Sequence, residues 1–151
     1  MISTVLRSVP NNKMQKVSLI VFLINIWVIS HFFTFTAVFK INLAHNTHLR
    51  SICLIIFWRH GPHSLKWLYT LLSQIVSPHM VHVSLEFQLE DVAVLDTVDW
   101  AEMEHEFTRQ RWASLQKLTL SWWGPTEIRP AVRESIRARL PVLRSSGILH
   151  V

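Results

Sequence analysis

Glycine is scarce in this sequence, with 3 residues among 151. So few glycines exclude the phosphate-binding loops of the G-x-G-x-x-G and Walker A types, and they exclude the nucleophile elbow of the α/β-hydrolases. Cysteine is scarcer still, because Cys53 is the only one. An intramolecular disulfide is therefore excluded, and we expect a reducing compartment, either cytoplasmic or nuclear.

Charged residues are also few, at 17% of the chain, and the mean hydropathy of +0.26 is high for a soluble protein. The charges divide by region. Eight of the ten acidic residues lie between Glu86 and Glu106, and eight of the fifteen basic residues lie between Arg109 and Arg144. The net charge of +5 is modest. This pattern is not that of a surface covered in positive charge, so nucleic acid is not expected as a partner.

One stretch, residues 17–39 from Val17 to Phe39, contains no charged residue in 23 positions. As a helix it would rise about 34 Å, enough to span the hydrocarbon core of a bilayer. The polar residues Asn25 and His31, and the many β-branched residues, are evidence against a membrane-spanning helix. Three interpretations stay open: a membrane helix, a pair of buried strands, or aberrant sequence that is not natively encoded. We therefore expect an apolar N-terminal segment at residues 1–37 and a separate domain at residues 38–151.

From about residue 38 a spacing of the form apolar-x-x-apolar-x-apolar recurs. It fits Leu49, Ile52 and Leu54; Met80, Val83 and Leu85; Leu115, Leu118 and Leu120; and a fourth set, Val38, Ile41 and Leu43, which is followed by Asn46. In a leucine-rich repeat such residues point inward from a short parallel strand, and the asparagine bonds backbone groups at the turn. The first three sets begin 31 and 35 residues apart, which is longer than the usual spacing of about 20–29. The fourth set lies too close to the next for a full repeat, so it is a hairpin or has another register.

Helical patterns separate these sets. We expect helices at residues 64–76, at 99–112 with Asp99 as its N-cap, and at 131–140, where Pro141 stops the helix; a strand at 147–151 follows. The expected inward residues are Leu65, Leu68, Leu72, Ile75, Trp100, Met103, Phe107, Trp112, Val132, Ile136 and Leu140. Alternation of strands and helices predicts parallel strands with helices on one side. The expected fold class is therefore α/β, an irregular leucine-rich-repeat-like solenoid fragment with an apolar N-terminal segment, helical or made of buried strands.

Several phrases of the sequence carry a likeness to a known family. An acidic loop precedes Asp99 and Trp100; the phrase WASLQKL follows at residues 112–118; and a helix ending in Leu140 and Pro141 runs into residues 147–151. With these features residues 85–151 resemble the C-terminal end of fungal F-box-type leucine-rich-repeat-like proteins, and a weaker likeness reaches back to about residue 38. The resemblance implies a substrate-recognition surface. The first 40 residues show no three-helix F-box pattern, so a Skp1-type adaptor of ubiquitin ligases is not expected as a partner.

The residues that could carry chemistry form no convincing site. The histidines include three i,i+3 pairs, His45/His48, His60/His63 and His79/His82, but a zinc site would need further ligands, and Cys53 is the only thiol. The acidic residues Glu90, Asp91, Asp96 and Asp99 lack the spacing of a calcium-binding loop. We expect them to form a solvated loop with a helix cap. No metal, no cofactor and no catalytic residue is expected, and the chain is not expected to be an enzyme.

Two sets of residues are candidates for binding a partner. Arg129, Arg133 and Arg137 form a stripe at helical spacing, which meets phosphates or an acidic partner, or is simply a solvated helix face. Trp122 and Trp123 are adjacent in an expected strand, so their side chains point to opposite sides. One of the two tryptophans should be exposed or lie at an interface, where tryptophan is enriched.

Three functions remain open at the level of sequence. The leading one is a non-catalytic protein-interaction module that resembles the substrate-recognition repeats of fungal F-box proteins and binds an unknown protein partner. The second is a small single-span membrane protein, anchored through residues 17–39. The third is a non-functional gene fragment, because a repeat array without its N-terminal cap exposes an apolar face.

Overall fold

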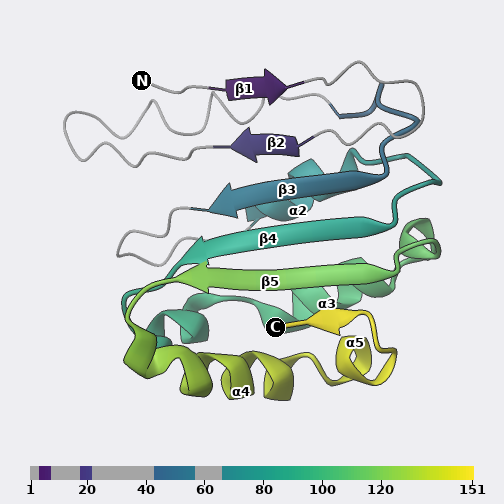
Figure 1. Ribbon diagram of the computed structural model, residues 1–151. Coiled ribbons are helices and arrows are strands. Elements are labelled where there is room, and N and C mark those ends of the chain that lie inside the picture. The colour runs from purple at the N-terminus through teal and green to yellow at the C-terminus, as the bar shows by residue number, and fades with distance from the viewer. Residues whose placement is uncertain (1–3, 8–17, 22–42, 57–65) are drawn as a thin grey trace.

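The computed structural model describes residues 4–7, 18–21, 43–56 and 66–151 (Figure 1). Strands β1 (Thr4–Arg7) and β2 (Ser18–Val21) form an antiparallel pair. Strands β3 (Ser51–Ile56), β4 (His82–Gln88), β5 (Lys117–Trp123) and β6 (Leu149–His150) form a four-stranded sheet in that order, and every neighbouring pair in it is parallel.

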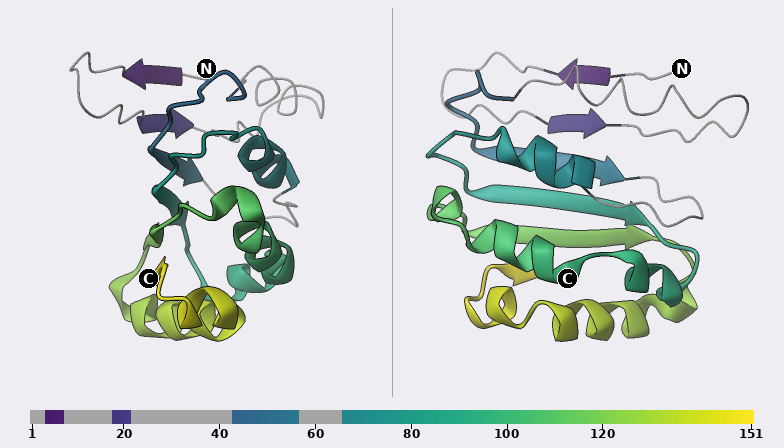
Figure 2. Two further views of the ribbon diagram at one scale, coloured as in Figure 1. Left: turned by 90° about the vertical axis from the view of Figure 1, so that its right-hand side faces the viewer. Right: turned by 180° about the vertical axis from the view of Figure 1, so that it is seen from behind.

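Helices connect the parallel strands. The α-helices are α2 (Lys66–Ser73), α3 (Trp100–Thr108), α4 (Arg129–Arg139) and α5 (Pro141–Ser145), and the short 3₁₀ helices are η1 (Val92–Thr97), η2 (Gln110–Trp112) and η3 (Thr126–Ile128). Helices α2 and α3 cover one face of the sheet, and α4 lies along its edge beyond β5 and β6 (Figure 2). The expected α/β fold with parallel strands and interspersed helices is confirmed.

The core is built from equivalent positions of successive strands. Ile52 pairs with Val83, which pairs with Leu118. Leu54, Leu85 and Leu120 form a second row in the same register. Each of these six side chains is at most 1% exposed. Leu49, Met80 and Leu115, which stand just before the three strands, are buried as well. The three sets of residues that share the sequence spacing therefore occupy equivalent places in the structure.

The turns that lead into the strands repeat the same hydrogen bonds. The carbonyl of Arg50 accepts hydrogen bonds from the amides of Val81 (2.9 Å) and His82 (3.1 Å). The carbonyl of Val81 in turn accepts from the amides of Gln116 (3.0 Å) and Lys117 (3.1 Å). Each entry segment is thus fixed to the next by a pair of backbone bonds, which sets the strand register.

The fourth set of the sequence pattern is described only in part, because Val38 and Ile41 lie outside the described residues. Leu43 is buried, and its amide donates to the Gln74 side chain (3.1 Å). Asn46 lies in the turn before β3, where its amide donates to the Leu43 carbonyl (3.0 Å). The alternative between a hairpin and another register stays open.

The helix boundaries differ from those expected. Helix α2 ends at Ser73, before Val76 and Pro78, while Ser64 and Leu65 lie outside the described residues. The expected cap of α3 is confirmed, because the Asp99 carboxylate accepts a hydrogen bond from the Glu102 amide (2.9 Å). All of the other expected inward residues are buried: Leu68, Leu72, Ile75, Trp100, Met103, Phe107, Trp112, Val132, Ile136 and Leu140.

The expected continuation of α3 to Trp112 is wrong, since the helix ends at Thr108 and a short 3₁₀ turn follows. The cause is the buried carboxylate of Glu106, which binds the side chains of Arg109 (3.0 Å), Arg111 and Trp112 (3.2 Å). These bonds draw the following segment back onto the helix, and Arg109 adopts an extended backbone.

Helix α5 was not predicted, since Pro141 was expected only to stop the preceding helix. A proline at the first turn favours a helix start. The Glu104 side chain of α3 accepts hydrogen bonds from the amides of Val142 (2.7 Å) and Leu143 (3.2 Å). A carboxylate at a helix N-terminus satisfies orphan amides and complements the helix dipole. Glu104 therefore ties α3 to α5.

Of the apolar residues 17–39, only Ser18–Val21 fall in the described part, where they form β2. The other residues of that stretch lie outside it, so the membrane helix stays a prediction. Within the described ranges, no helix has the length and apolar character needed to cross a membrane.

Gly124 directly follows β5, and Gly147 stands two residues before β6. Substitution of each glycine tests the packing around it. A Cβ on Gly124 would stand 1.9 Å from the Leu89 carbonyl oxygen, and a backbone atom cannot rotate away. We expect Gly124→Ala to lower the free energy of unfolding by about 3 kcal/mol. Gly147 has a φ of +76° with open space around it, so Gly147→Ala should cost about 1–2 kcal/mol. Urea denaturation followed by tryptophan fluorescence measures both losses, and a Gly124 variant as stable as the Gly147 variant would contradict the packing described.

Candidate interaction surface

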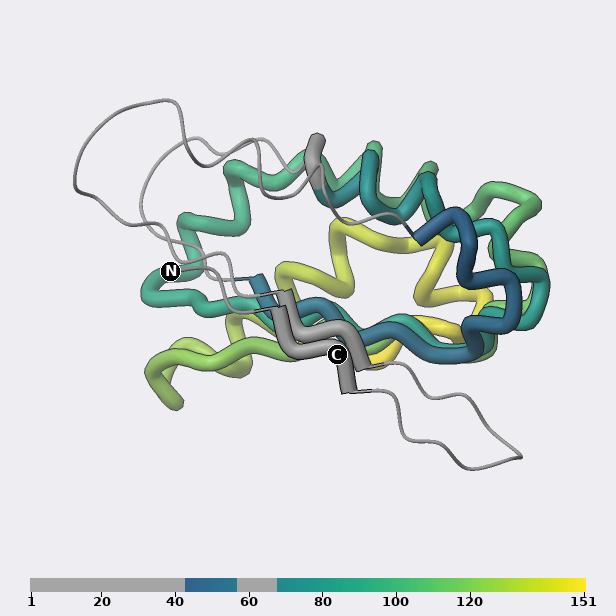
Figure 3. Tube along the Cα trace, turned by 90° about the horizontal axis from the view of Figure 1, so that it is seen from above, coloured from purple at the N-terminus to yellow at the C-terminus, as the bar shows by residue number. Residues whose placement is uncertain are grey.

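The sheet has one face that no helix of the described part covers (Figures 2 and 3). Because side chains alternate along a strand, the residues between the core positions point to this face. We call it the open face. In register, its rows are Ser51, His82 and Lys117; then Cys53, Ser84, Thr119 and His150; then Ile55, Glu86 and Ser121; and last Gln88 and Trp123. It is a polar surface with an aromatic residue at one end.

Hydrogen bonds between neighbouring strands order the centre of the open face. The His82 imidazole Nε2 lies 3.0 Å from the Thr119 hydroxyl, which bridges β4 and β5. The Cys53 thiol donates to the Glu86 carboxylate at 3.5 Å, which bridges β3 and β4. These side chains are half-buried, so their positions are set before any partner arrives.

Cys53 is held in its protonated form. The pKa of its thiol is raised from 9.0 to about 11, chiefly by burial and also by the negative charge of Glu86 and the hydrogen bond to that carboxylate. The thiolate is the nucleophilic form of cysteine. At neutral pH the Cys53 side chain is therefore a hydrogen-bond donor on the open face.

The two adjacent tryptophans point to opposite sides of the sheet, as expected. Trp122 is half-buried and packs against the core. Trp123 belongs to the open face, and 43% of its surface is exposed. It is fixed at the end of β5, where its carbonyl accepts a hydrogen bond from the Leu89 amide (2.9 Å). A tryptophan on a rigid strand end is a typical anchor for a protein partner, because it buries a large area at little entropic cost.

The arginine stripe lies on α4, at the edge of the sheet. Arg129 and Arg133 are exposed, whereas Arg137 forms an ion pair with Glu134 (3.2 Å) on the same helix. Val132, next to Arg133 on the same helix, is fully buried. The structure therefore places the arginines on a solvated helix face, on a different element from Trp123.

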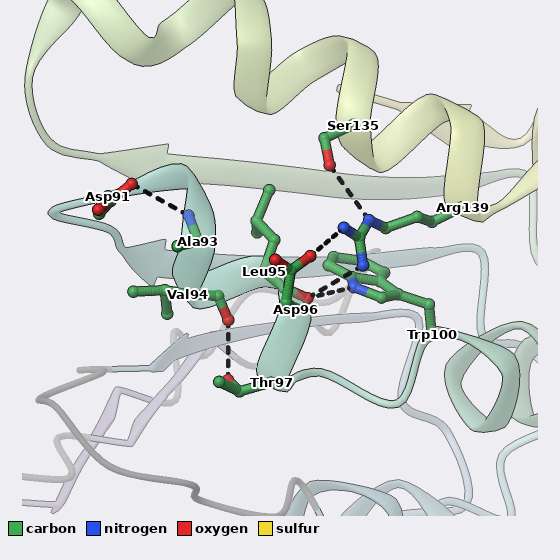
Figure 4. A network of polar contacts seen from close by, with 9 residues as sticks. All are labelled: Asp91, Ala93, Val94, Leu95, Asp96, Thr97, Trp100, Ser135 and Arg139. Atoms are coloured by element: carbon green, nitrogen blue, oxygen red, sulfur yellow. Dashed lines mark hydrogen bonds and ion pairs between the residues drawn. The ribbon is translucent and has the colours of Figure 1, made fainter.

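The acidic loop is used to fix local structure (Figure 4). The Asp91 carboxylate accepts from the Ala93 amide (3.0 Å) and caps η1. The Asp96 carboxylate pairs with Arg139 of α4. The Leu95 carbonyl accepts from the Trp100 indole (2.7 Å) and from Arg139 (3.5 Å). Among the carboxylates expected to form a solvated loop, Asp91 and Asp99 cap helices and Asp96 joins η1 to α4.

The structure brings together two histidines from different pairs of the sequence. His48 stacks on His79, with ring centroids 5.9 Å apart, whereas His82 bonds Thr119. His60 and His63 lie outside the described residues. Among the residues that are described, no group of three or more histidine, cysteine, aspartate or glutamate side chains comes together in a way that could hold a metal ion.

The residues of the open face were not predicted from the sequence to form one surface. Its polar residues stand between the apolar positions of the repeated spacing, so the alternation itself could have predicted them. The bonds of Glu86 to Cys53 and of His82 to Thr119 had no such signal, because each joins strands more than thirty residues apart.

Comparisons with known proteins give no assignment. No protein-family model matches this chain, and neither a curated protein nor a solved structure matches it.

The raised pKa of Cys53 predicts slow alkylation. A shift from 9.0 to about 11 lowers the thiolate fraction about 100-fold at pH 8. Iodoacetamide should therefore react about 100-fold more slowly with the folded chain than with the chain in urea. Glu86→Gln removes the nearby charge, lowers the pKa and should speed the reaction, whereas Glu134→Gln on α4 should leave it unchanged. Equal alkylation rates in the folded and the unfolded chain would show that Cys53 is not held as described.

Proposed function

We propose that this chain is a non-catalytic protein-interaction module that binds a protein partner on the open face of its parallel sheet. The observation that carries the proposal is the repetition itself. Three equivalent strand-and-turn units bury the same apolar positions, and each leaves polar side chains on the same uncovered face. Repeat proteins use surfaces of this kind for recognition.

Within this proposal the chain is an irregular leucine-rich-repeat-like solenoid fragment. This is supported by the burial of the three sets of residues that share the sequence spacing, which begin at Leu49, Met80 and Leu115. Each unit continues through a strand and into a helix, as leucine-rich repeats do. The resemblance to the substrate-recognition repeats of fungal F-box proteins agrees with this architecture. The module then supplies recognition, and recruitment of a ligase is not part of its proposed role.

The partners of its reactive side chains support a role without catalysis. Glu104 caps α5, and Glu106 is bound by two arginines. Cys53 is held as a thiol, since its pKa is raised to about 11. A general base or nucleophile needs a pKa near the working pH and access to a substrate. These groups are instead occupied in holding elements together.

Trp123 is the residue on which we expect binding to depend. A buried tryptophan anchor is typically worth at least about 2 kcal/mol of binding free energy. Trp123→Asp should therefore lower the recovery of specific partners from a fungal cell lysate by more than about tenfold. The measurement is a pull-down with the tagged full chain, quantified by mass spectrometry. Val142→Asp, which changes a 51% exposed apolar residue of α5, is the matched control.

Far-UV circular dichroism establishes that both variants fold. The proposal requires a set of proteins that the Trp123 variant loses and the Val142 variant retains. If both folded variants recover the same proteins as the wild type, the open face is not the recognition surface.

A further inference from the structure

The segments that lead into the three long strands lie side by side. We call them together the strand-entry edge: residues 44–51, 77–82 and 113–117. The Arg50 and Val81 carbonyls each bind two amides of the next segment, at 2.9–3.1 Å. Ser51, His82 and Lys117 pair in register where the strands begin. Residues far apart in sequence are thereby gathered on one edge of the molecule.

A shallow, open depression of about 360 Å³ lies between these segments. Each segment contributes to its lining, with Arg50 from the first, Pro78 and His79 from the second, and Ser114 and Gln116 from the third. The lining offers a guanidinium, an imidazole, a hydroxyl and an amide.

The charge of this edge has one sign. Residues 44–51, 77–82 and 113–117 contain no aspartate or glutamate. Arg50 and Lys117 are exposed cations, one at each side of the edge. The histidines His45, His48 and His79 of this edge are exposed as well.

Two carboxylates of neighbouring elements, Glu106 of α3 and Glu86 of β4, are engaged with other residues. Glu106, in the helix before the third segment, is 1% exposed and is bound by Arg109 and Arg111. Glu86 lies on the open face and accepts the hydrogen bond of Cys53. The strand-entry edge thus attracts anionic groups, and a guanidinium beside hydroxyl and amide donors suits a carboxylate.

On the basis of the proposed function, we infer that the partner carries an acidic peptide segment that docks on the strand-entry edge. The first row of the open face, from Ser51 to Lys117, is also part of this edge, so one partner contacts both surfaces. Two permanent cations suit a short acidic peptide, whereas nucleic acid is typically bound by neutralising many phosphates.

The inference is tested with a fluorescein-labelled oligo-glutamate peptide, whose anisotropy is measured against the full chain at low salt. The double variant Arg50→Gln and Lys117→Gln should weaken binding about tenfold. The control is Arg129→Gln and Arg133→Gln on α4, which removes the same charge from another surface and should leave binding within about twofold of the wild type.

Equal losses in the two double variants would overturn the inference, because they would show attraction to net charge alone. So would a single-stranded DNA oligonucleotide that binds more tightly than the peptide and depends on Arg50 and Lys117. Arg50→Lys with Lys117→Arg keeps the charges and should keep most of the binding. If the peptide does not bind while partners that need Trp123 are still recovered, the inferred docking of an acidic segment is wrong, and the proposed function as a recognition module is supported. If no partner depends on Trp123 but the peptide binds at the strand-entry edge, the proposed binding on the open face is wrong, and the binding of an acidic peptide at the edge is supported.

Discussion

The structure depends on the burial of one apolar ladder. Ile52, Val83 and Leu118 pair across three parallel strands, and a second row lies beside them. Burial of each such side chain contributes about 1.5–3 kcal/mol before the entropy of ordering is subtracted. Because side chains alternate along a strand, fixing these residues inward also fixes which residues face outward. The core and the candidate interaction surface therefore come from a single constraint.

Polar side chains then hold the helices against this ladder. Asp99 caps α3, and Glu104 of α3 caps α5, which lies far from it in the sequence. Arg139 joins α4 to η1 through Asp96 and the Leu95 carbonyl. One of these contacts, the ion pair of Asp96 with Arg139, joins the acidic block of the sequence to the basic block. The acidic block between Glu86 and Glu106 is paired largely within the layer of helices. The strand-entry edge keeps its positive charge because none of those carboxylates belongs to it.

Those parts of the fold that depend on local patterns could be predicted from the sequence. The spacing of Leu115, Leu118 and Leu120 gave the core of β5, and Asp99 gave the start of α3. The adjacent pair Trp122 and Trp123 predicted one exposed tryptophan, since a strand turns every second side chain to the same face. Each of these features depends on residues that are close together in the sequence: a repeated spacing, a helix cap or the alternation of side chains along a strand.

Features that join distant residues could not be predicted in this way. Helix α5 depends on Glu104, thirty-eight residues before Val142. The end of α3 depends on Glu106, whose burial has no signature in an acidic stretch. The stacking of His48 on His79 and the bond between Cys53 and Glu86 follow from the strand register. The open face and the strand-entry edge thus became visible as surfaces only once the strands were placed side by side.

The repeated units share one core and present one face of the sheet. The most direct measurement is urea unfolding of the full chain, followed by far-UV circular dichroism and by tryptophan fluorescence. Trp100 and Trp112 report on the segment between β4 and β5, and Trp122 reports on β5 itself. A shared core predicts a single cooperative transition that coincides in both signals, and Leu118→Ala should shift it in both by about 2–5 kcal/mol. Separate transitions, or a gradual loss of signal without a midpoint, would contradict the account.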